Sequence, residues 1–227
     1  MTRATPARGA AAQGLPRDVR GKRALILASA RALFIQSYER TTMDAIAERA
    51  TVSKATLYAH FAGKEDLFVA LVEDEVEALR QASTATGGRA DFSVEDRLMR
   101  FGTQLLELTL KSDNLALLRV LIGAGQRFPA LTQRVVDSVR APIRSAVVQL
   151  LEQAVAAGEL VCDDRRFAAD FFMRIINGGI RIDCLLDERL RPTPAQIHEH
   201  VGLCVQAFGL LLQARNGGPA GTTGPPR

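Results

Sequence analysis

The chain has 227 residues, of which 47% are hydrophobic, and a formal net charge of +4. This length is enough for one large or two modest domains with a proper core, and the composition is ordinary for a globular protein. The longest apolar run, Val201 to Leu212, is well short of the roughly 20 residues that a membrane span requires, which argues against a membrane protein.

Cysteine usage points to a reducing compartment. The three cysteines, Cys162, Cys184 and Cys204, lie late in the sequence, and no two of them have the spacing of a metal site. An odd, scattered set argues against a disulfide framework. No apolar segment follows the basic start of the chain, so we expect no secretory signal and a cytoplasmic protein.

Positive charge is concentrated in the first part of the chain. Residues 1–64 hold 11 Lys and Arg against 4 Asp and Glu, a net charge of +7, whereas residues 65–227 hold 18 against 21, a net charge of −3. Because duplex DNA is a dense polyanion whose counterions are displaced by basic side chains, this asymmetry favours nucleic-acid binding by the first part. A basic disordered tail would produce part of the same asymmetry.

The two ends of the chain differ from everything between them. Residues 1–17 and 215–227 are rich in Ala, Gly and Pro without periodicity, and we expect them to be disordered tails. Between them apolar residues recur at helical spacing, so we predict an all-α fold. A break is expected at residues 83–88, Ser-Thr-Ala-Thr-Gly-Gly.

Residues 18–64 are predicted to form three short helices. Thr41 or Thr42 is expected to cap the second helix and Ser53 the third, while Asp44 faces water. A tight turn separates the second and third helices, which makes a helix-turn-helix module. In such modules the second helix of the motif enters the major groove of DNA, with its N-terminal residues nearest the bases.

The outer face of the third helix is small and polar. Leu57 and Phe61 lie four residues apart and anchor the helix to the other two. Lys54 suits phosphates or guanine acceptors, whereas Ala55 and Thr56 let the backbone come close and can touch a thymine methyl group. These residues are therefore candidate readers of the base sequence.

Other polar residues are placed to hold the module on the backbone. Tyr58, His60, Thr42 and Lys64 can donate hydrogen bonds to phosphates, which fixes position more than sequence. Tyr58 or His60 taken alone is equally well explained as an ordinary surface residue. Their register with Lys54 and Lys64 favours DNA binding.

This region resembles the DNA-binding region of the tetracycline-repressor family of bacterial transcription regulators. The resemblance covers about residues 20–70 and is carried by Phe34, Tyr38, Thr41-Thr42, Ile46-Ala47, Ala50, Val52 to Tyr58, His60-Phe61, Lys64-Glu65 and Leu67-Phe68. By position it implies base-proximal roles for Met43, Lys54 and Ala55. The predicted DNA-binding residues are Thr42, Met43, Ser53, Lys54, Ala55, Thr56, Tyr58, His60 and Lys64.

Two residues depart from the pattern of that family. Ser37 and Thr51 stand where its members usually have glycine, which suits the left-handed conformation of a helix end or turn. We expect each of them to strain the module by about 1 kcal/mol without preventing the fold.

The rest of the chain is predicted to be a connecting helix, residues 65–82, and a helical domain, residues 91–214. Helices are expected at about 93–111, 114–126, 129–157, 165–187 and 195–213. In the resembling family such a domain binds an effector and carries the dimer contact. Phe101, Gln104, Leu105, Gln126, Phe128, Phe172 and Asn177 are candidate effector contacts, or they simply pack the core. The chain has only 5% aromatic residues and no Trp, which argues against a large aromatic cage for flat dyes or cations. We therefore expect a medium-sized, largely apolar ligand.

The last two helices are apolar on more than one face, so they need cover on both sides. A two-fold interface of two helices from each subunit would supply it, and a dimer also suits two reading helices on one DNA face. The predicted interface residues are Phe171, Ile175, Gly178, Gly179, Val201, Val205, Phe208 and Leu212. The alternative is that these residues form a monomeric core.

Enzyme and metal sites find no support in the sequence. Gly123 and Gly125 lack the third glycine of a dinucleotide fingerprint, and His200 and Cys204 share a helix face without a third metal ligand. We therefore expect no catalytic residue, metal or cofactor. The predicted function is a dimeric repressor that a small-molecule effector releases from a palindromic operator, and the alternative is a helical interaction protein whose basic module contacts RNA or protein.

Overall fold

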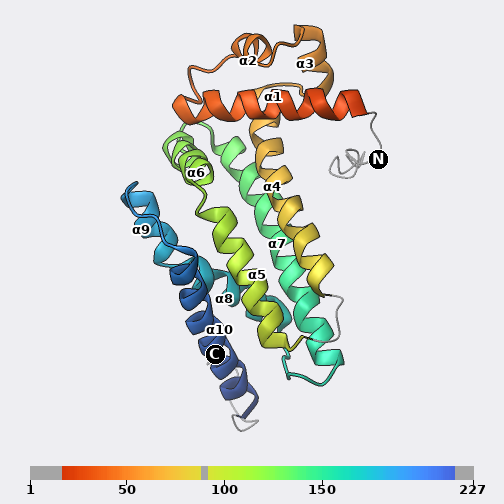
Figure 1. Ribbon diagram of the computed structural model, residues 1–227, viewed down its shortest axis with the longest axis vertical. Coiled ribbons are helices and arrows are strands. Elements are labelled where there is room, and N and C mark those ends of the chain that lie inside the picture. The colour runs from red at the N-terminus through yellow and green to blue at the C-terminus, as the bar shows by residue number, and fades with distance from the viewer. Residues whose placement is uncertain (1–16, 88–91, 218–227) are drawn as a thin grey trace, which may run out of the picture. The chain divides into compact units, whose positions relative to one another are not determined.

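The structure, a computed structural model, describes residues 17–87 and 92–217, which form ten helices and no strand (Figure 1). The all-α prediction is therefore confirmed. The helices are α1 (Arg17–Gln36), α2 (Met43–Arg49), α3 (Lys54–His60), α4 (Lys64–Gly87), α5 (Val94–Thr109), α6 (Ser112–Ala124), α7 (Pro129–Ala156), α8 (Arg165–Asn177), α9 (Ile180–Leu186) and α10 (Pro194–Gly217).

The chain divides into two compact units. Among the described residues, the head unit consists of those up to Ala78 together with Lys111–Ala141, and the body unit consists of those within Leu79–Leu110 together with those from Pro142 onward. The boundary falls inside α4, between α5 and α6, and inside α7, where Pro142 interrupts the helical hydrogen bonding. Two helices are therefore shared by both units.

The helix boundaries correct the sequence predictions in two places. α4 continues to Gly87 through most of the segment where a break was expected. The single helix predicted for 165–187 is wrong, because Gly178 and Gly179 separate α8 from α9, and Gly179 has a φ of 32° that ends the right-handed helix. α10 extends to Gly217, and the remaining parts of the predicted tails lie outside the described residues.

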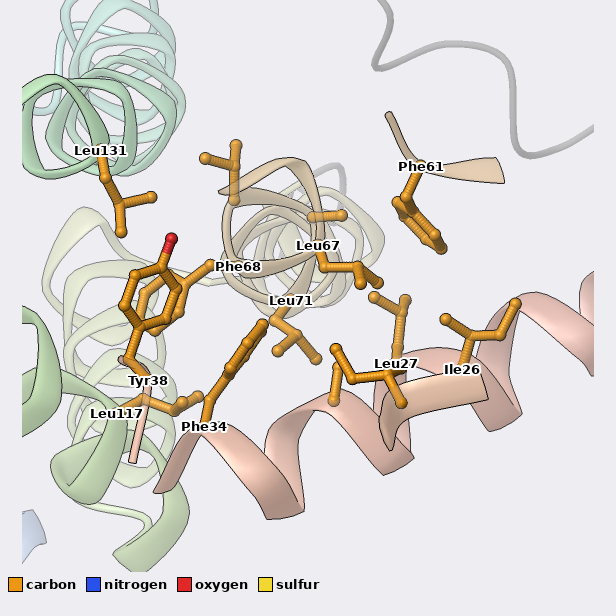
Figure 2. Packing of buried hydrophobic residues seen from close by; sticks show 14 of the residues in the cluster. Ile26, Leu27, Phe34, Tyr38, Phe61, Leu67, Phe68, Leu71, Leu117 and Leu131 are labelled. Atoms are coloured by element: carbon orange, nitrogen blue, oxygen red, sulfur yellow. The ribbon is translucent and has the colours of Figure 1, made fainter. Parts of the chain in front are cut away.

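Aromatic side chains form the centre of the head unit. The rings of Phe34 and Phe68 are 5.5 Å apart, and Tyr38 meets both Phe68 and Phe128 edge to face at 5.5 Å. Figure 2 shows Leu117 of α6 and Leu131 of α7 beside this cluster. Burying such rings removes a large apolar area from water, so α1 and α4 are held firmly under the two short helices of the motif.

Ion pairs add a polar layer to the head unit. Arg23 donates to both carboxylate oxygens of Asp74 at 2.6 and 2.8 Å, and Arg31 reaches Glu75 at 2.9 Å. Arg134 of α7 lies 2.6 Å from Asp66. The acidic side of α4 is thus paired with α1 and α7 instead of facing water alone.

The body unit contains a closely packed crossing of α5, α8 and α10. The ring of Phe172 lies 6.5 Å from that of Phe101 and 5.2 Å from that of Phe208. A side chain at Gly102 would come within 2.8 Å of Val201 Cγ1, so the helices approach closely only because this position has none. The buried guanidinium of Arg97 donates to Glu159 at 2.9 and 3.0 Å.

Candidate nucleic-acid interface

The start of α2 is fixed by two threonines with different tasks. Thr42 is the N-cap, and its Oγ1 accepts a hydrogen bond from the Ala45 amide at 3.2 Å. Thr41 is buried, and its hydroxyl donates to the Ser37 carbonyl at 2.7 Å. Because a capping hydroxyl uses only a lone pair, the O–H of the exposed Thr42 remains able to donate outward.

The turn between α2 and α3 contains a strained residue. Thr51 has a φ of 55°, the one positive φ among the described non-glycine residues. The left-handed conformation expected at this position is confirmed, and a β-branched side chain adopts it at a cost of about 1–2 kcal/mol. The strain expected at Ser37 is wrong, because its φ is not positive, and its amide continues the pattern of α1 with a hydrogen bond to the Leu33 carbonyl at 3.1 Å.

Ser53 is the N-cap of α3, as predicted. Its Oγ accepts from the Thr56 amide at 3.1 Å and lies 2.9 Å from the Thr56 hydroxyl, so the two predicted contacts form one local cap. Leu57 and Phe61 are buried, with 0% and 6% of their surfaces exposed. These anchors determine which side of α3 faces outward.

The outward side of α3 is small and basic. Lys54, Ala55 and Tyr58 are exposed, the last with 53% of its surface accessible, whereas His60 is half-buried. Ala59, which the predicted set omits, is also exposed four residues after Ala55. This spacing leaves a stretch of helix without bulky side chains, which lets the backbone approach a groove closely.

Lys54 is paired across the motif. Its Nζ donates to Asp44 Oδ2 at 2.7 Å, and both side chains are nearly two-thirds exposed. The hydrogen bond and the charge of Asp44 raise the pKa of Lys54. The sequence predicted only that Asp44 faces water, and it did not predict this ion pair between residues ten positions apart.

Lys64 lies under the turn that precedes α2. Its Nζ donates to the carbonyls of Tyr38, Glu39 and Thr41 at 2.9, 3.2 and 3.2 Å, and it lies 4.5 Å from the centre of the Tyr38 ring. Burial lowers the pKa of this ammonium group. All three N–H groups are thus engaged with the turn, so Lys64 holds the turn in place, and the predicted phosphate contact would require it to give up one of these bonds.

Met43, which the resemblance placed near the bases, is not fully exposed. Its side chain is half-buried and packs against the hydrophobic core of the head unit. Of the predicted DNA-binding residues, Thr42, Lys54, Ala55 and Tyr58 are therefore exposed, whereas Met43 is not fully exposed.

The candidate effector contacts are divided between the two units. Phe101, Leu105 and Phe172 are buried in the body unit, where Asn177 accepts a hydrogen bond from Thr109 at 3.4 Å. Gln104 is half-buried in the same unit. Gln126 is exposed and Phe128 packs on Tyr38, both in the head unit.

A cleft in the body unit was not anticipated from the sequence. It has a volume of about 440 Å³ and lies between α5, α10 and the segment after α7. Its lining is mostly apolar, with two carboxylates and one amide, and consists of Val94, Glu95, Leu98, Glu159, Leu160, Val161, Val205, Phe208, Gly209, Leu212 and Gln213.

The candidate dimer residues are found in different environments. Four are buried within the body unit, with 0 to 9% of their surfaces exposed: Val201, Val205, Phe208 and Leu212. Phe171, Ile175 and Gly178 are half-buried and Gly179 is exposed. Leu203 and Leu210 on α10 and Phe167 on α8 are the more accessible apolar residues, with exposed fractions of 63%, 66% and 44%.

The part of the chain that the structure describes contains neither a membrane-spanning helix nor a cluster of metal ligands. There, no helix is both long and apolar enough to cross a bilayer. No group of three or more His, Cys, Asp or Glu side chains within the described ranges could hold a metal ion.

Two family models match the chain. The model of bacterial regulatory proteins of the tetR family matches residues 26–71, which contain α2, α3 and most of α1. The model of the C-terminal domain of AefR-like transcriptional repressors matches residues 96–210, about half of the chain.

Individual relatives are transcription regulators as well. The HTH-type transcriptional regulator YdeS of Bacillus subtilis (strain 168), itself uncharacterized, is 31% identical over 152 residues, which are 65% of this chain and 71% of that one. The transcriptional activator FasR of Mycolicibacterium smegmatis is 43% identical over 77 residues, 32% of this chain and 34% of the relative.

Solved structures give the same fold. A TetR-family regulator from Mesorhizobium loti superposes with a TM-score of 0.74 at 23% identity, over 87% of this chain and 98% of that one. The flavonoid-responsive regulator FrrA has a TM-score of 0.62 at 32% identity, over 82% of this chain and 94% of its own.

Proposed function

This chain belongs to the tetR family of bacterial regulatory proteins, and from that membership we propose a cytoplasmic homodimeric repressor that a small molecule releases from a palindromic operator. The chain is a helix-turn-helix, DNA-binding transcriptional regulator. Its contacts, its assembly and its response to a ligand are the proposed parts.

The exposed face of α3 carries the proposal. Ala55 and Ala59 are small, so a DNA groove can come close to the backbone of α3. Lys54 and Tyr58 are exposed beside them, and Leu57 is buried on the opposite side of the helix. The cap Thr42 uses a lone pair to hold the backbone, so its O–H can still donate to a phosphate, and of the bonded hydroxyls of Ser53 and Thr56 one O–H stays available in the same way. This surface suits the major groove, with bases read at the start of α3 and phosphates held around it.

A second copy of the chain is the proposed partner of the body unit. Leu203, Leu210 and Phe167 expose apolar surface on α10 and α8, which a monomer would leave in water. Two-fold pairing of these helices would cover that surface and present two heads to a symmetric site. The buried Val201, Val205, Phe208 and Leu212 would then support the interface from behind.

A ligand response is supported by connectivity and by one relative. α4 and α7 each run as one helix from one unit into the other, so a change in the body can act on the head through them. FrrA, which is 32% identical, is flavonoid-responsive by name. We therefore propose a medium-sized, largely apolar effector, and the match to a repressor C-terminal domain favours release from DNA as its effect.

A gel shift with the DNA upstream of the chain's own gene tests the proposal. We expect binding that prefers this duplex over a scrambled one and that weakens steeply between 50 and 200 mM salt, as phosphate contacts require. Tyr58→Phe should remove one hydrogen bond from each subunit, about 2 kcal/mol for a dimer or roughly 30-fold in affinity.

The alternative function predicts a different pattern. A helical interaction protein would show no preference between the two duplexes, and it would instead bind a structured RNA or a protein tightly.

The effector proposal has its own test. Release of the duplex by a flavonoid such as naringenin would support a medium-sized, largely apolar effector, and no release by any flavonoid would contradict this proposal.

A further inference from the structure

Asp44 is out of place on a surface that meets a polyanion. It lies in the first turn of α2, and its carboxylate is 2.7 Å from the ammonium of Lys54, the first residue of α3. Both side chains are exposed, at 63% and 65%. The pair therefore stands on the edge of the motif where the two helices begin.

Stability explains little of this pair, because the ion pair and the place of Asp44 in the first turn of α2 each contribute at most about 1 kcal/mol. Exposed ion pairs contribute roughly 0–1 kcal/mol, because water already solvates both charges and two long side chains lose freedom. A carboxylate near DNA phosphates meanwhile lowers affinity for every sequence. A carboxylate in this position is therefore useful only if it helps the protein to discriminate between base sequences.

The chemistry of the pair matches one kind of base pair. In the major groove a C·G pair presents the N4 amino group of cytosine as a donor and O6 and N7 of guanine as acceptors. Asp44 supplies an acceptor and Lys54 a donor, and their atoms lie side by side within hydrogen-bond distance. Carboxylates accept from cytosine N4 and lysines donate to guanine, so the pair has both groups needed.

We propose that Asp44 is a specificity-determining residue that reads a C·G base pair in each half-site together with Lys54. This inference rests on the proposed DNA contact of α3. A second consequence follows from the same bond. Because the ammonium of Lys54 is engaged by Asp44, it is withheld from phosphates until a matching base pair takes over the hydrogen bonds.

Selection from a pool of random duplexes tests the inference. The wild-type chain should enrich a palindromic motif with one strongly preferred C·G pair in each half-site. Asp44→Ala should relax preference at that position and keep the rest of the motif. Asp44→Asn should shift it toward adenine, because an amide can pair with adenine N6 and N7.

Glu48→Ala is the matched control. Glu48 is also exposed on α2 and loses the same charge, but Lys54 keeps its partner. The motif of this variant should equal that of the wild type. Equal motifs for Asp44→Ala and the wild type would overturn the inference, whereas no motif for the wild-type chain would instead overturn the proposed function.

The salt dependence gives a second readout. On a scrambled duplex, where no matching base pair takes Lys54 from Asp44, Asp44→Ala frees one lysine per head for a phosphate, so the slope of log affinity against log salt should steepen by about 0.9 per head. Glu48→Ala should leave the slope unchanged. An equal change in both variants would mean that general charge, not the pairing with Lys54, is responsible, and would contradict the inference.

Discussion

The head and body units have similar interiors, but the helix faces that we propose as binding surfaces differ in character. Both are built on buried aromatic rings, Phe34 and Phe68 in one and Phe101 and Phe172 in the other. On α3 the head exposes lysine, alanine and tyrosine, whereas α10 of the body exposes Leu203. The residues left outside the core therefore separate a surface suited to a polyanion from one suited to another protein.

The largest expected effect comes from making the apolar surface of the body unit charged. Leu203→Glu combined with Leu210→Glu should raise the dimer dissociation constant by about 100-fold or more, because burying unpaired carboxylates costs about 3 kcal/mol or more. Sedimentation equilibrium measures the change, and operator binding should fall with it.

The control for that variant is a charge on another exposed apolar residue. Ile122→Glu on α6 of the head unit alters a side chain that is 62% exposed, and this variant should remain dimeric. A wild-type chain that is already monomeric at micromolar concentration would contradict the proposed interface.

Lys64 is expected to affect both the stability of the head unit and its affinity for DNA. Lys64→Met should lower the free energy of unfolding by about 2 kcal/mol, because three backbone carbonyls lose a charged donor. Urea unfolding followed by circular dichroism measures this loss, and DNA affinity should decrease as the turn before Thr42 loosens.

Arg40→Met provides the comparison for Lys64. It removes an exposed charge from the same turn and should leave the urea midpoint nearly unchanged. Full stability of Lys64→Met, together with weak DNA binding, would mean that Lys64 acts only as a phosphate contact.

Thr51 is a smaller test of strain in the motif. Thr51→Gly should raise the free energy of unfolding by up to about 1 kcal/mol, because relief of the left-handed strain exceeds the added freedom of the unfolded chain. Ser37→Gly should instead lower it by about 0.5–1 kcal/mol, since no positive φ is needed there. Destabilisation by both changes would show that Thr51 is unstrained.

Tyr38 gives the smallest effect at neutral pH. Its hydroxyl is buried without a hydrogen-bond partner and points toward Leu131 in Figure 2. Tyr38→Phe should therefore keep or slightly raise the thermal midpoint.

At high pH the stability of the wild-type chain and that of Tyr38→Phe should differ. Burial, followed by the charge of Glu65, raises the pKa of Tyr38 from 10.0 to about 12. Between these values the unfolded chain loses the proton while the folded chain keeps it, so stability is lost as the pH rises from about 10 to 12. Tyr38→Phe lacks this loss, and identical pH profiles for both chains would contradict the raised pKa.

The helix-turn-helix and the all-α fold could be predicted because their signals are local. Caps, apolar spacing and the turn all lie within about ten residues of one another, as with Ser53, Leu57 and Phe61. The break between α8 and α9 also had a local signal, since two successive glycines inside a helix cost about 1 kcal/mol each.

The remaining features depend on the tertiary arrangement. Lys64 meets carbonyls more than 20 residues earlier, and Asp44 meets Lys54 only because the turn places two helix starts together. The all-round apolar pattern of α10 predicted a core or an interface, but it could not separate the buried Val201 from the exposed Leu203. Only packed neighbours decide which face is covered.

Hydrogen exchange in the presence of duplex DNA tests most directly whether α3 is the surface that binds. With the duplex enriched by selection, we expect slower amide exchange in peptides covering residues 42–61 and no DNA-dependent change at the exposed face of α10. A bound duplex that leaves residues 42–61 unprotected, or that protects α10 instead, would contradict the assignment.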